Sequence, residues 1–401
     1  MEDLVDHQFI NGPINIIRLE GKVGDIQKVL YLFMDRHIPA CHQTKCSNIF
    51  AKDMALFLAE TMSRLQDSTQ QYDFFLEVRS DELTDEEVPA MYGERYLYTQ
   101  HWMYIEEVLA LFKRVFHYNP AENKVYRNAR FKNFRFHFFD IRNYFKAAIQ
   151  DVIHRLNMAL RGKQEVSVEL LKTVIGLQVE LKEMYLTVIG ALKAERGVEG
   201  TVVIKIHDLI DKDVMQQLGY KLKERYDHPE VKALVTKMVG GYIKDMETYV
   251  GLVNHFIDTL SRISEKVRDC QARKTCDVRL YQHLLKNSRM MASGASGAAL
   301  DIFARLTDAY FLRRFLDKDY ITHGIHYGGG YHGAESMFWL VKEMGFVVTH
   351  VANDSEPPED ITKWILEAQT HRHVFDIFDN DIQCSSMEHM PADFLGGQSD
   401  N

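Results

Sequence analysis

The chain has 401 residues, enough to bury a sizeable core, and this length suggests two or three domain-sized units. Hydrophobic residues make up 46% and charged residues 26%, a composition that excludes a disordered chain. The formal net charge of −9 argues against broad coating of nucleic acid, which needs a basic face. No secretory signal and no stretch of about 18 apolar residues is visible, so we expect an intracellular protein without a membrane span.

The five cysteines are scattered and odd in number, and they lie at positions 41, 46, 270, 276 and 384. Their spacings do not match a pair of short zinc knuckles. We therefore expect free thiols in a reducing compartment.

The first third of the chain predicts alternating strands and helices. Residues 14–19 and 28–34 are short apolar runs rich in β-branched and aromatic side chains, which is typical of strands. A helical apolar period covers 49–66, with Ser47 or Asn48 as the candidate N-cap, and 72–78 again reads as a strand. The strand, helix and strand from 28 to 78 predict a βαβ unit with a right-handed crossover.

The middle of the chain predicts helix after helix, and α/β character returns after it. Helical periods in the middle cover 140–161, 165–195, 207–226 and 229–268, with one candidate strand at 202–206. The last third predicts a helix at 298–316, a strand at 320–327, a glycine turn at 328–330, a helix at 333–344 and a strand at 346–351.

The predicted fold class is α/β, with a small parallel or mixed sheet flanked by helices. The N- and C-terminal thirds build this sheet, and a large all-helical insertion separates them. The predicted parts are the N-terminal half of the α/β domain (1–139), the helical insertion (140–290), the C-terminal half (291–352) and a partly disordered acidic tail (353–401).

The first candidate site lies where two predicted strands end. Asp35 and His37 follow the strand at 28–34, and Glu77 stands near the end of the strand at 72–78. In open α/β sheets ligands bind outside the carboxyl ends of the strands, so parallel strands would bring these side chains together. The alternatives are a capping Asp35 beside a surface His37, and a solvated Glu77 paired with an arginine.

The second candidate site lies around the glycine turn and the helix before it. Gly329 and Gly330 precede His332, and these glycines would either cradle an anion or let His332 approach the strand ends. On the preceding helix, Arg314 could clamp an oxyanion, and the alternative is a surface salt bridge. Asp308 and Tyr310 are on the same helix, as candidate supporting residues.

The segment 126–142 interleaves basic and aromatic residues. Arg135 and His137 alternate with phenylalanines and would share one face of a strand, and Asp140 and Arg142 follow. This pattern fits substrate binding by Arg135, His137 and Arg142, or a buried structural network in which Asp140 pairs with an arginine. Binding of single-stranded RNA is a third alternative, which the acidic net charge disfavours.

In this order, the motifs resemble a poorly characterised protein family of nucleocytoplasmic large (giant) DNA viruses. The motifs are Leu32-Phe-Met-Asp-Arg-His, Tyr72-Asp-Phe-Phe-Leu-Glu77, Arg135-Phe-His-Phe-Phe-Asp-Ile-Arg142, Asp308-Ala-Tyr310 through Arg314, and Tyr327-Gly-Gly-Gly-Tyr-His332. More distantly, the pattern is similar to the superfamily of erythromycin esterase, the ChaN haem-uptake lipoprotein and the Tiki/TraB metalloprotease-like proteins. The helical middle contributes little to either resemblance.

The distant resemblance implies a hydrolase-like site formed by His37, Glu77, Arg314 and His332. At the predicted strand ends, Asp35, His37, Glu77 and His332 are the candidate ligands of a divalent metal, the one cofactor that we expect. The alternative function is a catalytically inactive protein that is packaged in the virion or contacts host partners. The resemblance implies a location in the host cytoplasm during infection or in the virion, and it gives no substrate or partner.

Overall fold

The computed structural model shows that the two apolar runs at the start of the chain form a long β-hairpin, β2 (Pro13–Val23) and β3 (Ile26–Asp35). Gly24 stands in its two-residue turn with a φ of 54°, a conformation that glycine adopts without steric cost. The structure describes residues 9–40, 46, 48–78, 103–119, 124–141, 151–152, 154–156, 158–159, 167–193, 222–223, 225–273, 304–353, 356–379 and 382–391.

The main sheet has six strands in the order β10-β2-β3-β9-β5-β8. The additional strands are β5 (Tyr72–Leu76), β8 (Phe134–Phe138), β9 (His323–Gly329) and β10 (Val347–Val351). Four neighbouring strands, β3, β9, β5 and β8, run parallel, whereas β2 pairs antiparallel with both β3 and β10. The mixed α/β fold class is thereby confirmed. The predicted βαβ unit contains β9, from the last third of the chain, inserted between its two strands.

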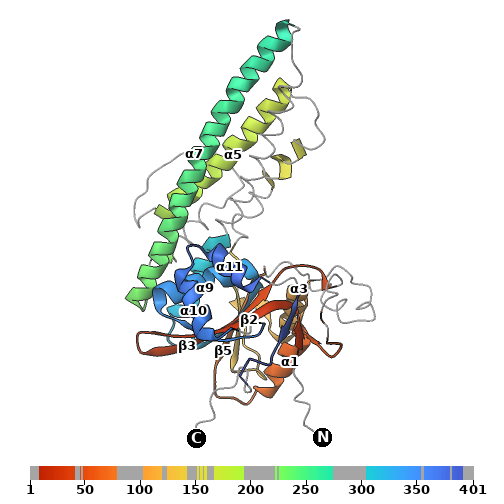
Figure 1. The fold of residues 1–401 in the computed structure, drawn as a ribbon, viewed down its shortest axis with the longest axis vertical. Helices are drawn as coiled ribbons and strands as arrows, with labels where there is room; N and C mark the ends of the chain where they lie inside the picture. Colours follow the sequence, from red (N-terminus) through yellow and green to blue (C-terminus); the bar gives the residue numbers. More distant parts are fainter. Residues whose placement is uncertain are drawn as a thin grey trace. The chain divides into compact units, whose positions relative to one another are not determined.

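Helices cover both faces of this sheet (Figure 1). α1 (Met54–Arg64) and α3 (Tyr104–Val115) pack on the face that carries Phe33, Phe74 and Tyr327. α9 (Gly330–Met344), α10 (Pro358–Glu367) and α11 (His371–Phe378) lie together on the opposite side, where α9 contacts β3 and β9. The helical residues 304–316 also belong to that side, because Phe311 packs against Phe75 and His326.

The chain divides into two compact units. The first contains residues 1–140, 226–234 and 310–401, and the second contains 141–225 and 235–309. In the second unit, α5 (Val168–Lys193) and the part of α7 (Pro229–Arg273) after residue 234 lie side by side, with the Tyr185 and Tyr249 rings 4.5 Å apart. Both helices agree with the predicted periods, whereas residues 202–206 and most of 140–161 and 207–226 lie outside the described residues.

The segment after residue 353, which we expect as an acidic tail, contains regular structure. Its residues form α10, α11 and the short strand β11 (Cys384–Ser386). β11 pairs with β1 (Phe9–Asn11), which also pairs with β4 (Lys52–Asp53), and a further hairpin joins β6 (Tyr118–Asn119) to β7 (Lys124–Val125). An apolar face explains the difference, since Val374 and Phe378 of α11 are buried.

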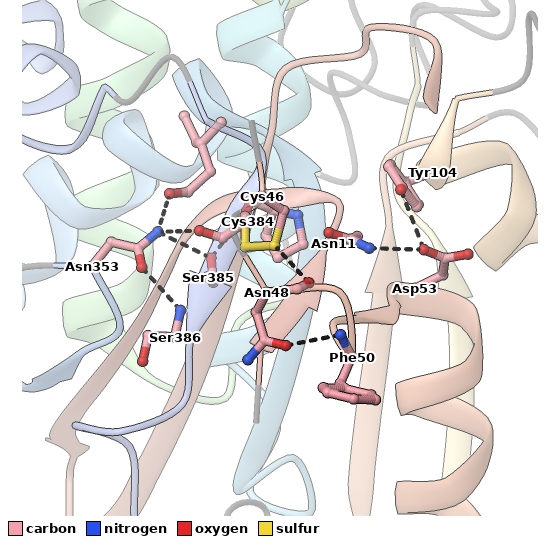
Figure 2. The surroundings of a disulfide bond; sticks show 12 residues. Asn11, Cys46, Asn48, Phe50, Asp53, Tyr104, Asn353, Cys384, Ser385 and Ser386 are labelled. Carbon is pink, nitrogen blue, oxygen red and sulfur yellow. Dashed lines mark hydrogen bonds between the residues drawn. A yellow bond between two sulfur atoms is a disulfide. The ribbon is translucent and has the colours of Figure 1, made fainter. Parts of the chain in front are cut away.

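The expectation of free thiols is wrong for Cys46 and Cys384, which form a disulfide (Figure 2). Their spacing of 338 residues hides the pairing in the sequence, because it depends on the sheet in which β1 pairs with both β11 and β4. Cys270 is disulfide-bonded as well. In the described part of the chain, no helix is both long enough and apolar enough to span a membrane.

Candidate active site

The parallel strands β3, β9 and β5 bring distant polar residues to one edge of the sheet. Asp35, the last residue of β3, is opposite Gly329, and Leu76 at the end of β5 is opposite Tyr327. Glu77 continues this pairing, because its backbone N–H donates to the carbonyl of Tyr327 at 3.0 Å. The carboxyl ends of all three strands therefore meet at the same edge, as the sequence predicts for Asp35 and Glu77.

His37 is held against Asp35 by a sharp change in backbone direction. β3 ends at Asp35, and His37 has a φ of 54°, which is uncommon for a residue other than glycine. Asp35 Oδ2 accepts from the His37 backbone N–H at 3.0 Å and lies 2.7 Å from its Nδ1. The two side chains therefore meet through a turn that follows the strand.

Glu77 is buried at the centre of the cluster. Its Oε1 lies 2.9 Å from His332 Nε2, and its Oε2 lies 3.4 Å from His37 Nε2. Oε2 also accepts the backbone N–H of Gly329 at 2.5 Å. Because His332 is on α9 and His37 follows β3, one carboxylate joins the ends of three elements.

Two glycines make this approach possible. A Cβ on Gly329 would stand 3.0 Å from His37 Nε2 and 3.3 Å from Glu77 Oε2. A Cβ on Gly328 would stand 2.9 Å from Glu77 Oε2, so a side chain at either position would displace the carboxylate. These residues end β9 and lead directly into α9, so the expected glycine turn is not a separate element. Gly330 faces Phe375, away from Glu77.

The charges of this cluster reinforce one another. Burial alone would raise the pKa of Glu77, but His332 and His37 hold the pKa well below its ordinary value, so the carboxylate stays ionised. Burial would lower the pKa of His37, yet the hydrogen bonds and charges of Asp35 and Glu77 raise it to about 10. The His37 side chain is 35% exposed, which leaves a charged imidazole accessible at the strand ends.

His326 is a histidine of this site that the sequence did not single out. Its register with Phe75 places it on the same sheet face as Glu77. It is fully buried between the rings of Phe139 and Phe311, at centroid distances of 4.8 and 4.7 Å. Neither ring nitrogen has a hydrogen-bond partner among the residues that the structure describes. Burial, helped by His332, lowers its pKa to about 3 and keeps the imidazole neutral.

Gln383 is a second residue that the sequence did not reveal. Its buried side-chain amide donates to Asp35 Oδ1 and to the carbonyl of Gly12, each at 2.7 Å. It orients the carboxylate that in turn holds His37. No sequence signal marks it, because its segment has the composition of a tail. His326 and Gly328 are two residues apart in one strand and therefore face the same side of the sheet. This alternation is the one sequence signal that could have placed His326 beside Glu77.

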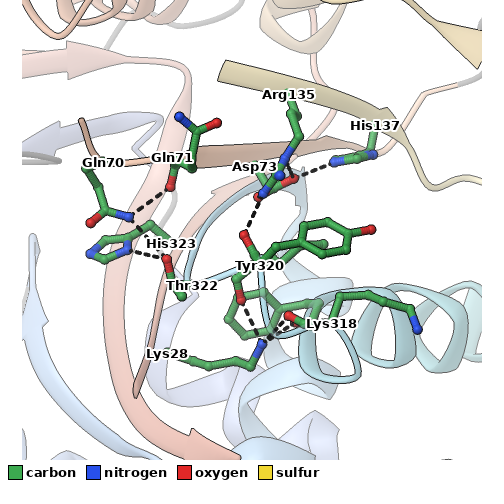
Figure 3. Close-up of polar contacts among 12 residues, drawn as sticks. Lys28, Gln70, Gln71, Asp73, Arg135, His137, Lys318, Tyr320, Thr322 and His323 are labelled. Atoms are coloured by element: carbon green, nitrogen blue, oxygen red, sulfur yellow. Dashed lines mark hydrogen bonds and ion pairs between the residues drawn. The ribbon is translucent and has the colours of Figure 1, made fainter. Parts of the chain in front are cut away.

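A second polar cluster lies toward the amino ends of the strands (Figure 3). The buried Asp73 accepts from Arg135 Nε at 2.7 Å and from Arg135 Nη2, and its Oδ1 lies 2.7 Å from His137 Nε2. Arg135 also donates to the Tyr320 carbonyl at 2.7 Å and lies over its ring. His137 and Arg135 lower the pKa of Asp73 against the effect of burial, so the carboxylate is ionised and paired.

The structure brings Arg314 to this second cluster and not to Glu77. The helix 304–316 runs toward the amino ends of the strands, where Lys28 caps its end by donating to the Phe315 carbonyl at 3.1 Å. The charge of Arg314 acts on His137, and in the described part of the chain no ion pair joins Arg314 to Glu77. The expected position of Arg314 at the carboxyl ends is wrong, because the helix direction was not readable from its spacing.

The remaining expected site residues are dispersed. Asp140 is buried just after Phe139 at the end of the first unit, and Asp308 is buried in the second unit. Tyr310 is half-buried on the helix 304–316, and Arg142 lies outside the described residues. With Arg135 engaged by Asp73 and Tyr320, this arginine does not contribute to an exposed basic face of the kind that RNA binding requires.

Two imidazoles and one carboxylate are the groups that could hold a cation at the strand ends. Nitrogen and oxygen ligands of this kind suit zinc and other first-row transition metals. Among the described residues, no group of three or more histidine, cysteine or acidic side chains is arranged so that it could hold a metal ion as it stands. Without a cation, the cluster can present the His37 imidazole and the Glu77 carboxylate to a shared water molecule.

These features define a mixed α/β protein with a polar carboxyl-edge site and a separate helical unit. The chain belongs to a family of unknown function (DUF5847), whose model matches residues 8–395. It is 32% identical over 411 residues to "Uncharacterized protein R706" of Acanthamoeba polyphaga mimivirus, a match that covers 96% of this chain and 97% of the relative. "Uncharacterized protein R160" of the same virus is 30% identical over 430 residues, with the same coverage. No solved structure matches.

The family membership confirms the resemblance to conserved proteins of giant viruses. The mimivirus relatives align over nearly their whole length, so the aligned region includes the residues of the helical unit. Their printed names give no activity, and function must therefore be argued from the site.

Proposed function

We propose that this protein is a hydrolase in which His37 and Glu77 activate a water molecule at the carboxyl edge of the sheet. The spacing of 3.4 Å between His37 Nε2 and Glu77 Oε2 carries this proposal. It is longer than a good hydrogen bond, so the two atoms are placed to share a third partner. The partly exposed His37 ring gives that partner access to solvent and substrate.

Asp35 supports the proposal by fixing the orientation of His37. Its contact with Nδ1 leaves Nε2 directed toward Glu77, the arrangement by which a carboxylate orients a histidine for proton transfer. Substrate would lie beside the start of α9, where backbone N–H groups and the helix dipole favour a developing oxyanion.

A divalent cation belongs to the proposal as the cofactor. When bound, it would lower the pKa of a coordinated water molecule and supply hydroxide near neutral pH. The ionised Glu77 and the imidazole of His332 are the groups that would hold it. His37, which is charged in the folded chain, would then donate a proton from Nε2 to the leaving group and recover one from the attacking water molecule, while Asp35 holds its other nitrogen.

Hydrolysis of three chromogenic probes tests the proposal: a carboxylic ester, a peptide amide and a phosphate ester. The full-length protein should turn over at least one of them. His37→Ala and Glu77→Gln should lower kcat by about 10²- to 10⁴-fold, the usual contribution of a general acid or base. His255→Ala, which removes an exposed histidine of the second unit, should leave the rate unchanged.

Turnover that survives in both site variants would contradict the proposal. A chain that hydrolyses none of the probes, with or without added Zn²⁺ or Mn²⁺, would instead favour the inactive scaffold that is packaged in the virion or binds host partners. Circular dichroism of each variant separates a loss of chemistry from a loss of fold.

We also propose the virion, rather than the host cytoplasm, as the location of the protein. Disulfides persist in oxidising surroundings and are rare in a reducing cytosol. The Cys46–Cys384 bond supports this assignment. Thiol alkylation followed by mass spectrometry of purified particles and of infected-cell cytosol tests it, with the oxidised chain expected in the particles.

A further inference from the structure

We propose that Tyr331 forms a stacking subsite beside the candidate active site and binds an aromatic ring of the substrate. This inference rests on the proposed hydrolase function and deepens it, because it names a substrate class. The substrate is a molecule in which the bond to be hydrolysed lies next to a neutral aromatic group. Tyr331 binds that group, and the chemistry is left to His37 and Glu77.

Tyr331 lies at the carboxyl edge of the sheet, in the first turn of α9. β9 ends at Gly329, and α9 begins at Gly330. The residue after Tyr331 is His332, whose Nε2 lies 2.9 Å from Glu77 Oε1. Consecutive Cα atoms are about 3.8 Å apart, so a group bound on Tyr331 is within reach of a bond held at Glu77.

A path of contacts through α11 joins Tyr331 to His37. The Tyr331 ring packs on Phe375 of α11, with the ring centroids 4.2 Å apart. One turn later, the Asp379 backbone N–H donates to the Phe375 carbonyl at 2.9 Å, and the Asp379 carboxylate accepts from Arg36 at 2.6 Å. Arg36 directly precedes His37. Together with the buried carboxylate that both histidines contact, these residues form a closed ring of contacts at the strand ends.

The members of this ring differ in their exposure to solvent. Glu77 and His332 are buried, whereas Tyr331 is 49% exposed. The side chains that keep an exposure of 29–35% are those of His37, Arg36 and Asp379. A substrate that is bound at Glu77 therefore extends over these exposed members, and Tyr331 is the aromatic residue among them.

The Tyr331 ring is fixed on one face and open on the other. Phe375 lies nearly parallel beneath it, at an interplanar angle of 16°, and is itself buried. Gly330 lets Phe375 approach α9, because a Cβ there would stand 2.6 Å from Phe375 Cε2. With one face held by a buried ring and half of the residue in solvent, Tyr331 presents a rigid aromatic platform. Aromatic groups stack on such a face with a gain beyond the burial of apolar area.

The charges around the platform favour a neutral aromatic group over a cation. A tyrosine face also attracts ammonium groups. However, the hydrogen bonds and charges of Asp35 and Glu77 raise the pKa of His37 to about 10, so His37 is positively charged, as is Arg36. Both would repel a cationic group of the substrate. The acidic side chain nearby, Asp379, is engaged by Arg36.

The test compares hydrolysis of benzyl acetate and cyclohexylmethyl acetate by the full-length chain, followed by titration of the released acid. A methylene group separates the ring from the ester in both compounds, so their intrinsic reactivities are similar. Ethyl phenylacetate and ethyl cyclohexylacetate place the same rings on the acyl side. Wild type should prefer the phenyl member of at least one pair through a lower KM. Tyr331→Leu should reduce that preference in kcat/KM by about 2- to 10-fold, the value of an aromatic pair.

Two further variants are controls. Tyr331→Phe keeps the ring without the hydroxyl and should retain the phenyl preference. Trp364→Leu removes an exposed aromatic ring of α10 and should behave as wild type. Trp364 is far from the strand ends, since the neighbouring Thr362 accepts the backbone N–H of Val348 at the start of β10, at the amino edge of the sheet. If the chain cleaves amides or phosphate esters instead, their benzyl and cyclohexylmethyl forms replace the acetates.

Equal rates for both rings in wild type, or an unchanged phenyl preference in Tyr331→Leu, would overturn the subsite. Hydrolysis that still depends on His37 would then leave the proposed function standing. A preference for the choline ester of acetic acid that is lost in Tyr331→Leu would assign the platform to a cation and overturn the aromatic class. If Tyr331→Leu does not fold, Tyr331→Met is compared in the same way.

A chain that hydrolyses none of these compounds is tested for binding. Saturation-transfer NMR then compares benzylacetone, a ketone that cannot be hydrolysed, with its cyclohexyl analogue. Stronger binding of benzylacetone that is lost in Tyr331→Leu would support the subsite while the proposed hydrolase function fails. Equal binding of the two ketones, or no binding, would overturn the subsite.

Discussion

The amino-side cluster of Asp73, Arg135 and His137 and the carboxyl-edge cluster around Glu77 lie on the same face of one sheet, yet they differ in how fully their polar atoms are paired. Arg135 engages both oxygens of Asp73, and His137 completes the set. At the carboxyl edge, His37 is partly exposed and its contact with Glu77 is 3.4 Å long. The ring nitrogens of His326 have no hydrogen-bond partner in the described part of the chain. A fully paired ion network stabilises the fold, whereas polar side chains with incomplete pairing mark a candidate site for a ligand.

Removing the central carboxylate of the amino-side cluster should have the largest effect on stability. Asp73→Asn leaves Arg135 next to a neutral partner in a buried site, and we expect a loss of about 3–5 kcal/mol in the free energy of unfolding. Urea denaturation measures it. The exposed Asp67→Asn should change the same quantity by less than about 0.5 kcal/mol. A loss below about 1 kcal/mol for Asp73→Asn would break the contrast between the clusters.

Breaking the disulfide should come next and should affect the carboxyl edge. Cys46→Ser releases a cross-link between residues 338 apart, and we expect a loss of about 2–4 kcal/mol. Because Gln383 adjoins Cys384, the orientation of Asp35 and the hydrolytic rate should also suffer. Ser386→Ala, at the other end of β11, is the control for both measurements. Unchanged stability in Cys46→Ser would show that this edge holds its shape without the bond.

Lys28 tests the amino side a second time, with a smaller expected effect. Its buried ammonium group donates to the carbonyls of Phe315, Lys318 and Ile321 at 3.1, 2.8 and 2.7 Å (Figure 3). Lys28→Met leaves these carbonyls without that donor but adds apolar packing, so we expect a net loss of about 2 kcal/mol. Thermal unfolding measures it against Lys22→Met on the same hairpin. A gain in stability would contradict the capping role.

The smallest effect should be the dependence of stability on pH. His37 and His137 each contact a carboxylate, and their contributions to stability should change with pH in opposite directions. His37 has a raised pKa in the folded chain, so the stability it contributes is complete below about 6.5 and is lost as pH rises toward 10. Burial, with the charges of Arg314 and Arg135, lowers the pKa of His137, so its contribution is present above about 6.5 and is lost as pH falls.

Urea midpoints of metal-free protein between pH 5 and 9 check this pair. Relative to wild type, His37→Gln should remove the decline on the alkaline side, and His137→Gln should remove the decline on the acidic side. The difference in urea midpoint between wild type and His37→Gln is reduced because the His37 side chain is partly exposed to solvent. Curves that change in the same direction for both variants would show that the two clusters have the same electrostatics.

Local patterns predicted much of the architecture, since strands and helices depend mainly on side-chain periodicity. The sequence predicted the right type of element in four long segments. The apolar runs form the strands β3 and β5, and the long helical periods form α5 and α7. Boundaries were less accurate: the helix expected from residue 49 begins at Met54, with Asp53 as its N-cap. The tail was misread because its acidic composition conceals the buried faces of α10 and α11.

By itself, the sequence determined that the chain is α/β at both ends and helical between them, and it placed Asp35 and Glu77 at strand ends. Period and composition suffice for this, because they are local properties of the chain. The tertiary structure alone decided that β9 inserts between β3 and β5, so that Glu77 meets His332, and His326 comes to lie beside them. It also decided that Gln383 and the disulfide hold this edge and that Arg314 lies elsewhere. These contacts join residues hundreds of positions apart, and they depend on strand order and helix direction, which no local pattern encodes.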